Sequence, residues 1–222
     1  MSVPRPLALV TATAASAIIL GACGSSDPQD ANEPTGDYEV EITNSKFTTE
    51  QRLAETRNLV LGVENTGSET VPELAFTVFT DESGAGEAGG AVDSTSDGSF
   101  NVRSDQPGLE NPNRPVWVLE PKFPRFVGEP PPRGLSGGFR VQTNTFGFGP
   151  LQPGETKEVV WRLTPVQAGT YTLSYIVAAG LDGNAKAVTS SGEDVKGEFI
   201  VEITDQPPRA RVNNQGKVVI EN

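Results

Sequence analysis

The chain has 222 residues, with 17 Lys and Arg against 29 Asp and Glu, a net charge of -12, no His, one Cys and one Met. A chain this acidic argues against nucleic-acid binding, because neutralising phosphates requires clustered Lys and Arg. The absence of His excludes a catalytic triad or a metal site built on imidazole.

The first 22 residues have the organisation of an export signal. Arg5 is their only charged residue, and the 14 residues from 7 to 20 are Ala, Leu, Ile, Val, Thr and Ser only. A membrane-spanning helix needs roughly 20 apolar residues, so this run is too short to be one. We expect residues 1–22 to be a cleaved signal peptide.

The signal ends in Leu20-Gly21-Ala22-Cys23, which resembles the lipobox of bacterial membrane lipoproteins. The resemblance implies that the Cys23 thiol receives a diacylglyceryl group and that the chain is cut just before it. Two acyl chains hold a protein stably on a membrane, whereas one binds only marginally. We therefore expect a lipid-anchored protein on the extracytoplasmic face of the cell membrane. An ordinary signal peptide with a chance cysteine, or an uncleaved anchor, is the alternative.

Cleavage and lipidation would leave a chain without His, Met or a free thiol. No disulfide could form, and only oxygen ligands would remain for a metal. Catalysis would need paired carboxylates or a Ser–Lys pair, and neither stands in a recognisable setting. We expect no enzymatic activity, no cofactor and no bound metal.

Residues 23–36 contain no large apolar side chain and are rich in Ser, Pro, Asp and Gly, which is typical of a flexible tether. From residue 37 onward, apolar and polar residues alternate as in half-buried antiparallel strands. The alternation is clearest in six segments: 38–43, 59–63, 74–78, 159–163, 171–177 and 199–203.

Strands of this kind separated by Gly and Pro turns predict an all-β chain with a single β-sandwich over residues 37–205. The pair Asp182-Gly183 further predicts a hairpin between the fifth segment and the short run 185–189. Residues 206–222 would form a C-terminal tail, with a short strand around 218–220 or a frayed end.

Two stretches resemble the extracellular Ig-like repeats of bacteria, of the cell-adhesion-related type. They are VENTGSETVPELAFTV (63–78) and LQPGETKEVVWRLTPVQAGTYTLSYIV (151–177). The arrangement also resembles lipoproteins of high-GC Gram-positive bacteria. The resemblance implies an Ig-like antiparallel sandwich and carries little information on function. Tyr171 would then be either a tyrosine corner or an ordinary core residue.

The segments 40–47 and 169–177 also resemble strands of the cupredoxin sandwich. Copper in that family needs two His, a Cys and usually a Met, which the processed chain would not have. The alternative fold is therefore a cupredoxin-like sandwich without copper.

A long insertion over residues 81–138 departs from the usual domain of about 100 residues. Its first part, 81–114, is rich in Gly, Ser and Asp and is expected to be a mobile loop. Residues 115–120 are expected to form an edge strand, residues 121–138 an extended Pro-rich segment, and residues 138–148 to contain a further strand.

The insertion also provides the candidate binding surface. Aromatic and Arg side chains, a combination common in protein and sugar contacts, gather at Trp117, Phe123, Arg125, Phe126 and Arg133. If the surface binds a partner, Trp117 and Phe126 should be exposed. The alternative is that these rings cover the open edge and end of the sandwich.

Acidic side chains on the outward faces of the first and last strands raise the question of calcium. Glu39 and Glu41 would face Glu198 and Glu202 if these strands were neighbours, and Asp93 and Asp97 of the loop are further acids. No calcium-binding loop motif is present. The alternative is an ordinary solvated acidic surface.

The sequence as a whole predicts a non-catalytic binding or structural module of the cell envelope. Its partners would be the membrane, through Cys23, and a cell-wall or envelope protein. The alternative is an accessory subunit that docks on a membrane or envelope protein complex through the Pro-rich, aromatic insertion.

Overall fold

The structure, a computed structural model, describes residues 33–80, 100–103, 107–108, 110, 113–130, 139–140, 144–207 and 209–221. All regular elements in these ranges are strands: β1 (Gly36–Lys46), β2 (Glu50–Arg52), β3 (Arg57–Asn65), β4 (Ala75–Thr80), β5 (Asn101–Arg103), β6 (Asn113–Pro115), β7 (Trp117–Leu119), β8 (Arg125–Phe126), β9 (Phe139–Arg140), β10 (Thr145–Gly147), β11 (Thr156–Pro165), β12 (Gly169–Ala178), β13 (Ala185–Val188), β14 (Lys196–Thr204), β15 (Arg209–Val212) and β16 (Val218–Glu221). None of these residues belongs to a helix with the length and apolarity needed to cross a membrane.

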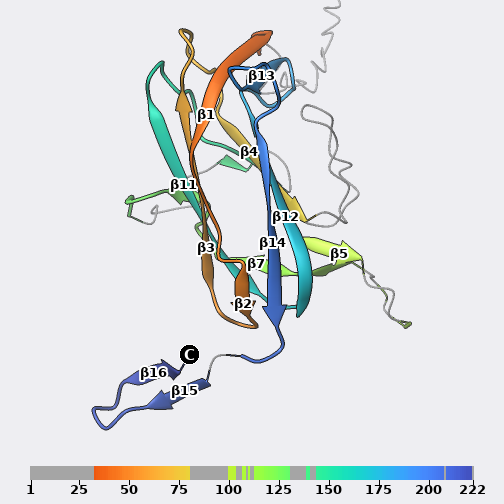
Figure 1. The fold of residues 1–222 in the computed structure, drawn as a ribbon, viewed down its shortest axis with the longest axis vertical. Helices are drawn as coiled ribbons and strands as arrows, with labels where there is room; N and C mark the ends of the chain where they lie inside the picture. The colour runs from red at the N-terminus through yellow and green to blue at the C-terminus, as the bar shows by residue number, and fades with distance from the viewer. Residues whose placement is uncertain are drawn as a thin grey trace, which may run out of the picture.

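Two six-stranded sheets face each other in the body of the molecule (Figure 1). Sheet I has the order β13-β1-β3-β11-β7, and β8 pairs with β11 beside β7. Sheet II has the order β2-β14-β12-β4-β10-β9. The strands β15 and β16 form a separate two-stranded hairpin beyond the end of the sandwich (Figure 1).

The strand order identifies the sandwich as Ig-like. In the Ig fold, strands A, B, E and D form one sheet and strands C, F and G the other. Here β1-β3-β11-β7 and β4-β12-β14 occupy these places in the same chain order. The fold class expected from the sequence is confirmed, and so are its six strands, which are β1, β3, β4, β11, β12 and β14.

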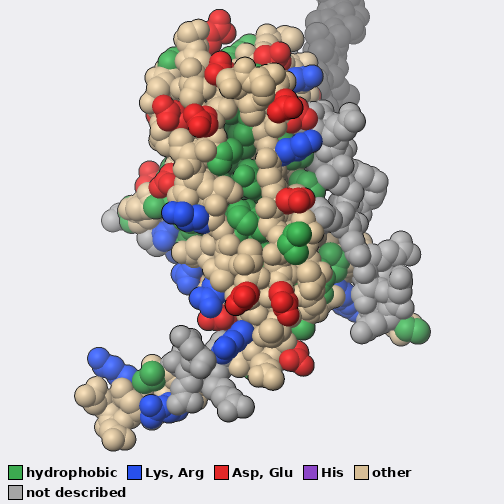
Figure 2. All heavy atoms as spheres, in the orientation of Figure 1, with side chains coloured by type: hydrophobic (Ala, Val, Ile, Leu, Met, Phe, Trp, Pro, Cys, Tyr) green, Lys and Arg blue, Asp and Glu red, His purple; other side chains and the backbone are tan. Residues whose placement is uncertain are grey.

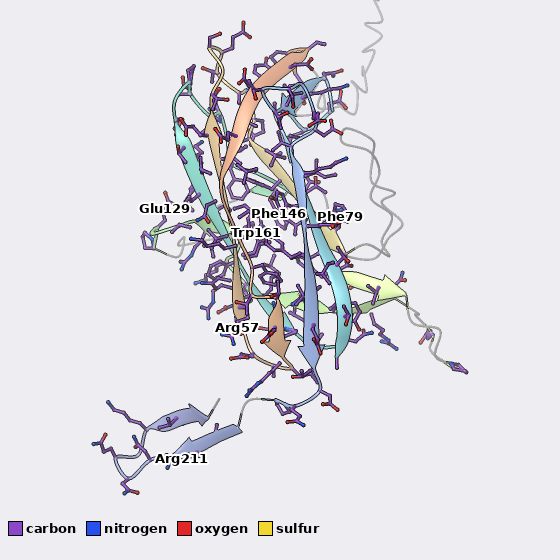
Figure 3. All side chains as sticks on the ribbon, viewed as in Figure 1. Arg57, Phe79, Glu129, Phe146, Trp161 and Arg211 are labelled. Carbon is purple, nitrogen blue, oxygen red and sulfur yellow. The ribbon has the colours of Figure 1, made fainter. Side chains whose placement is uncertain are left out.

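The inward residues of both sheets form one hydrophobic core. At its centre, the ring of Trp161 lies 5.5 Å from that of Phe76 and 6.4 Å from that of Phe146, both edge to face. Figure 3 shows Trp161 and Phe146 pointing into the space between the layers. Trp161 belongs to β11 of sheet I, whereas Phe76 and Phe146 belong to β4 and β10 of sheet II, so these ring contacts join the two sheets. Each ring pair contributes about 0.5–1.5 kcal/mol beyond burial of its area.

Tyr171 forms the hydrogen bond of a tyrosine corner. Its hydroxyl donates to the backbone carbonyl of Ala168 at 2.9 Å. Gly169 between them has φ +144°, and a Cβ at this position would lie 2.9 Å from the Tyr171 hydroxyl. Glycine is therefore required at position 169. Of the two interpretations of Tyr171, the tyrosine corner is the correct one.

The hairpin predicted at Asp182-Gly183 is wrong. Strand β13 pairs with β1, in parallel, from Gly36↔Ala185 to Glu39↔Val188. The reason lies in β12, which is a central strand with β14 on one side and β4 on the other. No edge of β12 is free, so the chain crosses to the edge of sheet I instead.

The insertion is more ordered than its composition indicates. Within the segment expected to be a loop, β5 and β6 pair with each other, and Phe100 and Val102 are buried in the core. The expectation of a loop is therefore wrong for these residues, while residues 81–99 lie outside the described part. The predicted edge strand is β7, which pairs with β11, and the further strand corresponds to β9 and β10.

Candidate binding surface

Trp117 is a core residue and not part of an exposed surface. It lies on β7 at the edge of sheet I with only 1% of its surface exposed. Its indole Nε1 donates a 2.9 Å hydrogen bond to Oε1 of Gln51 on β2, which is also buried. The exposure of Trp117 that the binding hypothesis required is not found, because the indole N–H finds its polar partner inside the sandwich and not in solvent.

Two guanidinium groups contact the ring of Phe123. The guanidinium carbon of Arg125 is 4.5 Å from the ring centroid, and that of Arg162 is 5.6 Å from it. Only 8% of Phe123 is exposed. Arg162 is also paired with Glu120, whose Oε2 is 2.9 Å from Nε. The ring thus makes cation–π contacts with two half-exposed cations.

The register of β8 separates Arg125 from Phe126. Arg125 is opposite Val160 and Phe126 opposite Val159, which is fully buried. Antiparallel partners share a face, so Phe126 points inward and Arg125 outward. The half-buried ring of Phe126 packs 5.6 Å from that of Phe148 at the margin of the core. It covers the edge of the sandwich, as the alternative reading of these aromatics proposed.

Lys157 completes the surroundings of Phe126. Its Nζ lies 5.6 Å from the Phe126 ring centroid and donates hydrogen bonds to the carbonyls of Phe148 (3.1 Å) and Pro150 (2.6 Å). We call Phe123, Arg125 and Arg162, which lie together on the outer side of sheet I, the insertion cluster. Figure 2 shows Lys and Arg side chains on the β11 side of the molecule.

The insertion cluster has half-exposed guanidinium groups with apolar surface nearby. Nη1 of Arg125 is buried and has no hydrogen-bond partner among the described residues, so this nitrogen is not itself accessible to a partner. Val118 and Val127 nearby in the chain are 48% and 46% exposed. Of the residues predicted for this surface, Phe123 and Arg125 lie together on the outer face, while Phe126 points inward and Trp117 is in the core. Arg133 and the lipidation residue Cys23 lie outside the described part of the chain.

A polar cleft at the end of the sandwich was not expected from the sequence. Its volume is about 460 Å³, and it lies where β2 and the start of β3 meet β14. Arg57, labelled in Figure 3, pairs with Glu55 there, with Nη2 2.6 Å from Oε1. The lining consists of three carboxylates, two guanidinium groups and two neutral polar side chains: Glu50, Gln51, Arg52, Glu55, Arg57, Glu202 and Thr204.

No sequence signal could have located this cleft, because its two halves are far apart in the chain. They meet only because β2 joins sheet II, although β1 and β3 on either side of it in the chain belong to sheet I. There β2 pairs in parallel with β14, with Glu50 opposite Glu202. The mixed charge of the lining suits a polar ligand and not an apolar one.

The arrangement considered for calcium is not formed. Strand β1 belongs to sheet I and β14 to sheet II, so Glu39 and Glu41 do not face Glu198 and Glu202 across neighbouring strands. In the described part of the chain, no group of three or more His, Cys, Asp and Glu side chains could hold a metal ion. Asp93 and Asp97 of the insertion lie outside that part.

No protein-family model matches the sequence, and no curated protein matches it. Among solved structures, the chain is similar to a CARDB domain from Pyrococcus furiosus, with 14% identity, a TM-score of 0.40, and 77% of this chain and 94% of that chain covered. A PapD-like domain of human CEP192 has 12% identity and a TM-score of 0.38, with 77% and 88% covered. A cohesin module from a Clostridium perfringens family 33 glycoside hydrolase has 13% identity and a TM-score of 0.37, with 75% and 98% covered. These likenesses concern the β-sandwich and not the site.

Proposed function

We propose that the chain is a lipid-anchored protein of the extracytoplasmic membrane face, whose Ig-like sandwich is a non-catalytic binding or structural module of the cell envelope. The lipobox Leu20-Gly21-Ala22-Cys23 supports the anchor, since it contains the only cysteine of the sequence. A tether rich in Ser, Pro, Asp and Gly follows and would hold the domain away from the lipid.

The observation that carries the binding role is the insertion cluster. Two guanidinium groups, of Arg125 and Arg162, are held against one buried ring on the outer side of sheet I. Contact with the ring favours these positions before a partner arrives, which reduces the entropy lost on binding. A planar guanidinium offers several N–H donors to carboxylates and carbonyls. A partner with acidic groups at its surface fits this cluster.

The anchor is tested on the native protein from membranes. Mass spectrometry of the amino-terminal peptide is expected to show a diacylglyceryl group on Cys23 and no residue before it. Cys23→Ala should leave the protein uncleaved or release it from the membrane. An unmodified start at Met1, or a Cys23→Ala protein that is still processed and membrane-bound, would contradict lipidation.

The binding role is tested by crosslinking in intact cells, followed by separation of membrane and cell-wall material. Arg125→Glu is expected to remove the crosslinked product. Lys186→Glu is the matched control, because it makes the same charge change at an exposed residue of β13. A product that persists in Arg125→Glu, or that is lost equally in both variants, would exclude the insertion cluster as the binding surface.

An accessory subunit of a membrane or envelope complex is the second candidate. The exposure of Val118 and Val127 beside the cluster favours it, because apolar side chains flanked by Arg are typical of protein interfaces. The same crosslinking experiment separates the two roles. A stoichiometric membrane protein that depends on Arg125 supports the accessory subunit, and retention on wall glycans supports the module.

A further inference from the structure

The loop between β12 and β13 surrounds a carboxylate. Oε2 of Glu33 accepts hydrogen bonds from the backbone N–H groups of Leu181 (2.6 Å) and Asp182 (2.7 Å). Oε1 accepts a third from the backbone N–H of Ala185 at 2.7 Å. Convergent backbone N–H groups of this kind form an anion-binding nest, and hydrogen bonds to an ionised acceptor are stronger than those between neutral groups.

Two glycines give the loop its shape. Gly183 has φ +81°, a left-handed conformation that favours glycine. Gly180 is in direct proximity to the carboxylate, and a Cβ built on it would overlap Glu33 Oε1. The loop therefore closes on the Glu33 side chain from two sides, and its sequence suits this carboxylate contact.

The contact lies immediately before the sheet begins. The N–H of Gly36 donates to the carbonyl of Asn184 at 3.1 Å, and the parallel ladder of β1 and β13 starts at Gly36↔Ala185. Glu33 thus fastens the segment that precedes β1 to the same loop that introduces β13.

We propose that the loop of residues 180–185 is a carboxylate-binding site whose resident ligand is Glu33, and that it clasps the tether to the domain. This rests on the proposed function, in which the chain is anchored at Cys23. Because Glu33 is bound to the loop, only the nine residues 24–32 lie between the lipidated Cys23 and the domain. A segment of this length can span at most about 30 Å. The clasp also turns the end of the sandwich with β13 toward the membrane and the β15–β16 hairpin away from it (Figure 1).

The site itself is tested on the chain without lipid, by amide hydrogen exchange. Glu33→Ala is expected to raise the exchange rates of the Leu181, Asp182 and Ala185 amides by about tenfold or more, because their acceptor is removed. Glu198→Ala, which removes an equal charge from the exposed face of β14, should leave these rates unchanged. Glu33→Gln keeps one carbonyl oxygen and should lie between the two.

Chemical rescue identifies the class of ligand. Formate added to Glu33→Ala should restore protection of the same three amides, and chloride at equal ionic strength should not. Unchanged exchange in Glu33→Ala, or equal effects of formate and chloride, would overturn the carboxylate site.

The orientation is tested on the lipidated protein in vesicles with a headgroup quencher. A fluorophore on Ser190→Cys, in the turn after β13, should be quenched strongly, and one on Gln215→Cys, in the hairpin turn, should not. Equal quenching would overturn the orientation. Failure of the protein to bind vesicles would contradict the lipid anchor, while the exchange experiment decides the carboxylate site independently.

Discussion

Trp117 on β7 donates its indole N–H to the side-chain oxygen of Gln51 on β2, over 2.9 Å and inside the core. Gln51 is in turn held by its Nε2, which donates to the carbonyl of Thr48 at 2.7 Å. The bond joins an edge of sheet I to an edge of sheet II. It therefore ties the insertion, through β7, to the strand that forms one wall of the end cleft.

Replacing Gln51 with Leu should lower the free energy of unfolding by about 2 kcal/mol, because the buried Trp117 N–H loses its acceptor. Urea denaturation of Gln51→Leu, Trp117→Phe and the double variant measures this. The double variant should lose less than the two single variants together, with a coupling of about 1 kcal/mol. Strict additivity would show that the hydrogen bond contributes nothing to stability.

The tyrosine corner makes a smaller and separate contribution. Tyr171→Phe removes only the hydroxyl that bonds Ala168 and should lower the free energy of unfolding by about 1 kcal/mol. Tyr38→Phe is the matched control, since Tyr38 is a buried tyrosine of β1 whose hydroxyl makes no hydrogen bond to the described residues. Equal losses in urea denaturation for both variants would contradict a specific role of the corner.

Gly180 and Glu33 should behave as a coupled pair. Gly180→Ala is expected to lower the melting temperature measurably in the natural sequence, because the new Cβ overlaps the Glu33 carboxylate. In the Glu33→Ala background the same substitution should have little effect. A Gly180→Ala loss of the same size in both backgrounds would mean that the glycine is needed for backbone conformation and not for the carboxylate.

Removal of the C-terminal hairpin should leave the sandwich intact. Strands β15 and β16 pair with each other and with no other strand of the described structure. An isolated two-stranded hairpin is marginally stable in water and adds little to a neighbouring domain. A chain ending at Asp205 is therefore expected to melt within about 2 °C of the full chain. A larger fall, measured by circular dichroism, would reveal packing between the hairpin and the body.

Much of the sandwich could be predicted from residue alternation. In β1, for example, Tyr38 and Val40 are buried while Glu39 and Glu41 are exposed. Alternation identifies the inward face of a strand but not the sheet that the strand joins. The segment Ala185–Val188 shows this, because its two buried alanines could face the core from either sheet. It pairs with β1 because β12 has no free edge.

The binding surface was predicted less well for a related reason. Composition drew attention to the aromatic and Arg residues of the insertion, but their separation depends on which residues of β11 they pair with. Trp117 pairs with Pro165 at one end of β11, while Arg125 pairs with Val160 further along. The Glu33 site could not be predicted at all, because its donors are backbone N–H groups, which every residue except proline has.

The parallel pairing of β2 with β14 has a mechanical consequence. Strand β2 lies near the start of the domain and β14 near its end, with Glu50↔Glu202, Gln51↔Ile203 and Thr204↔Arg52 side by side. A pull on the two ends of the chain would drag these strands past each other in opposite directions. Their hydrogen bonds would then bear the load together and not break one after another, an arrangement that resists force.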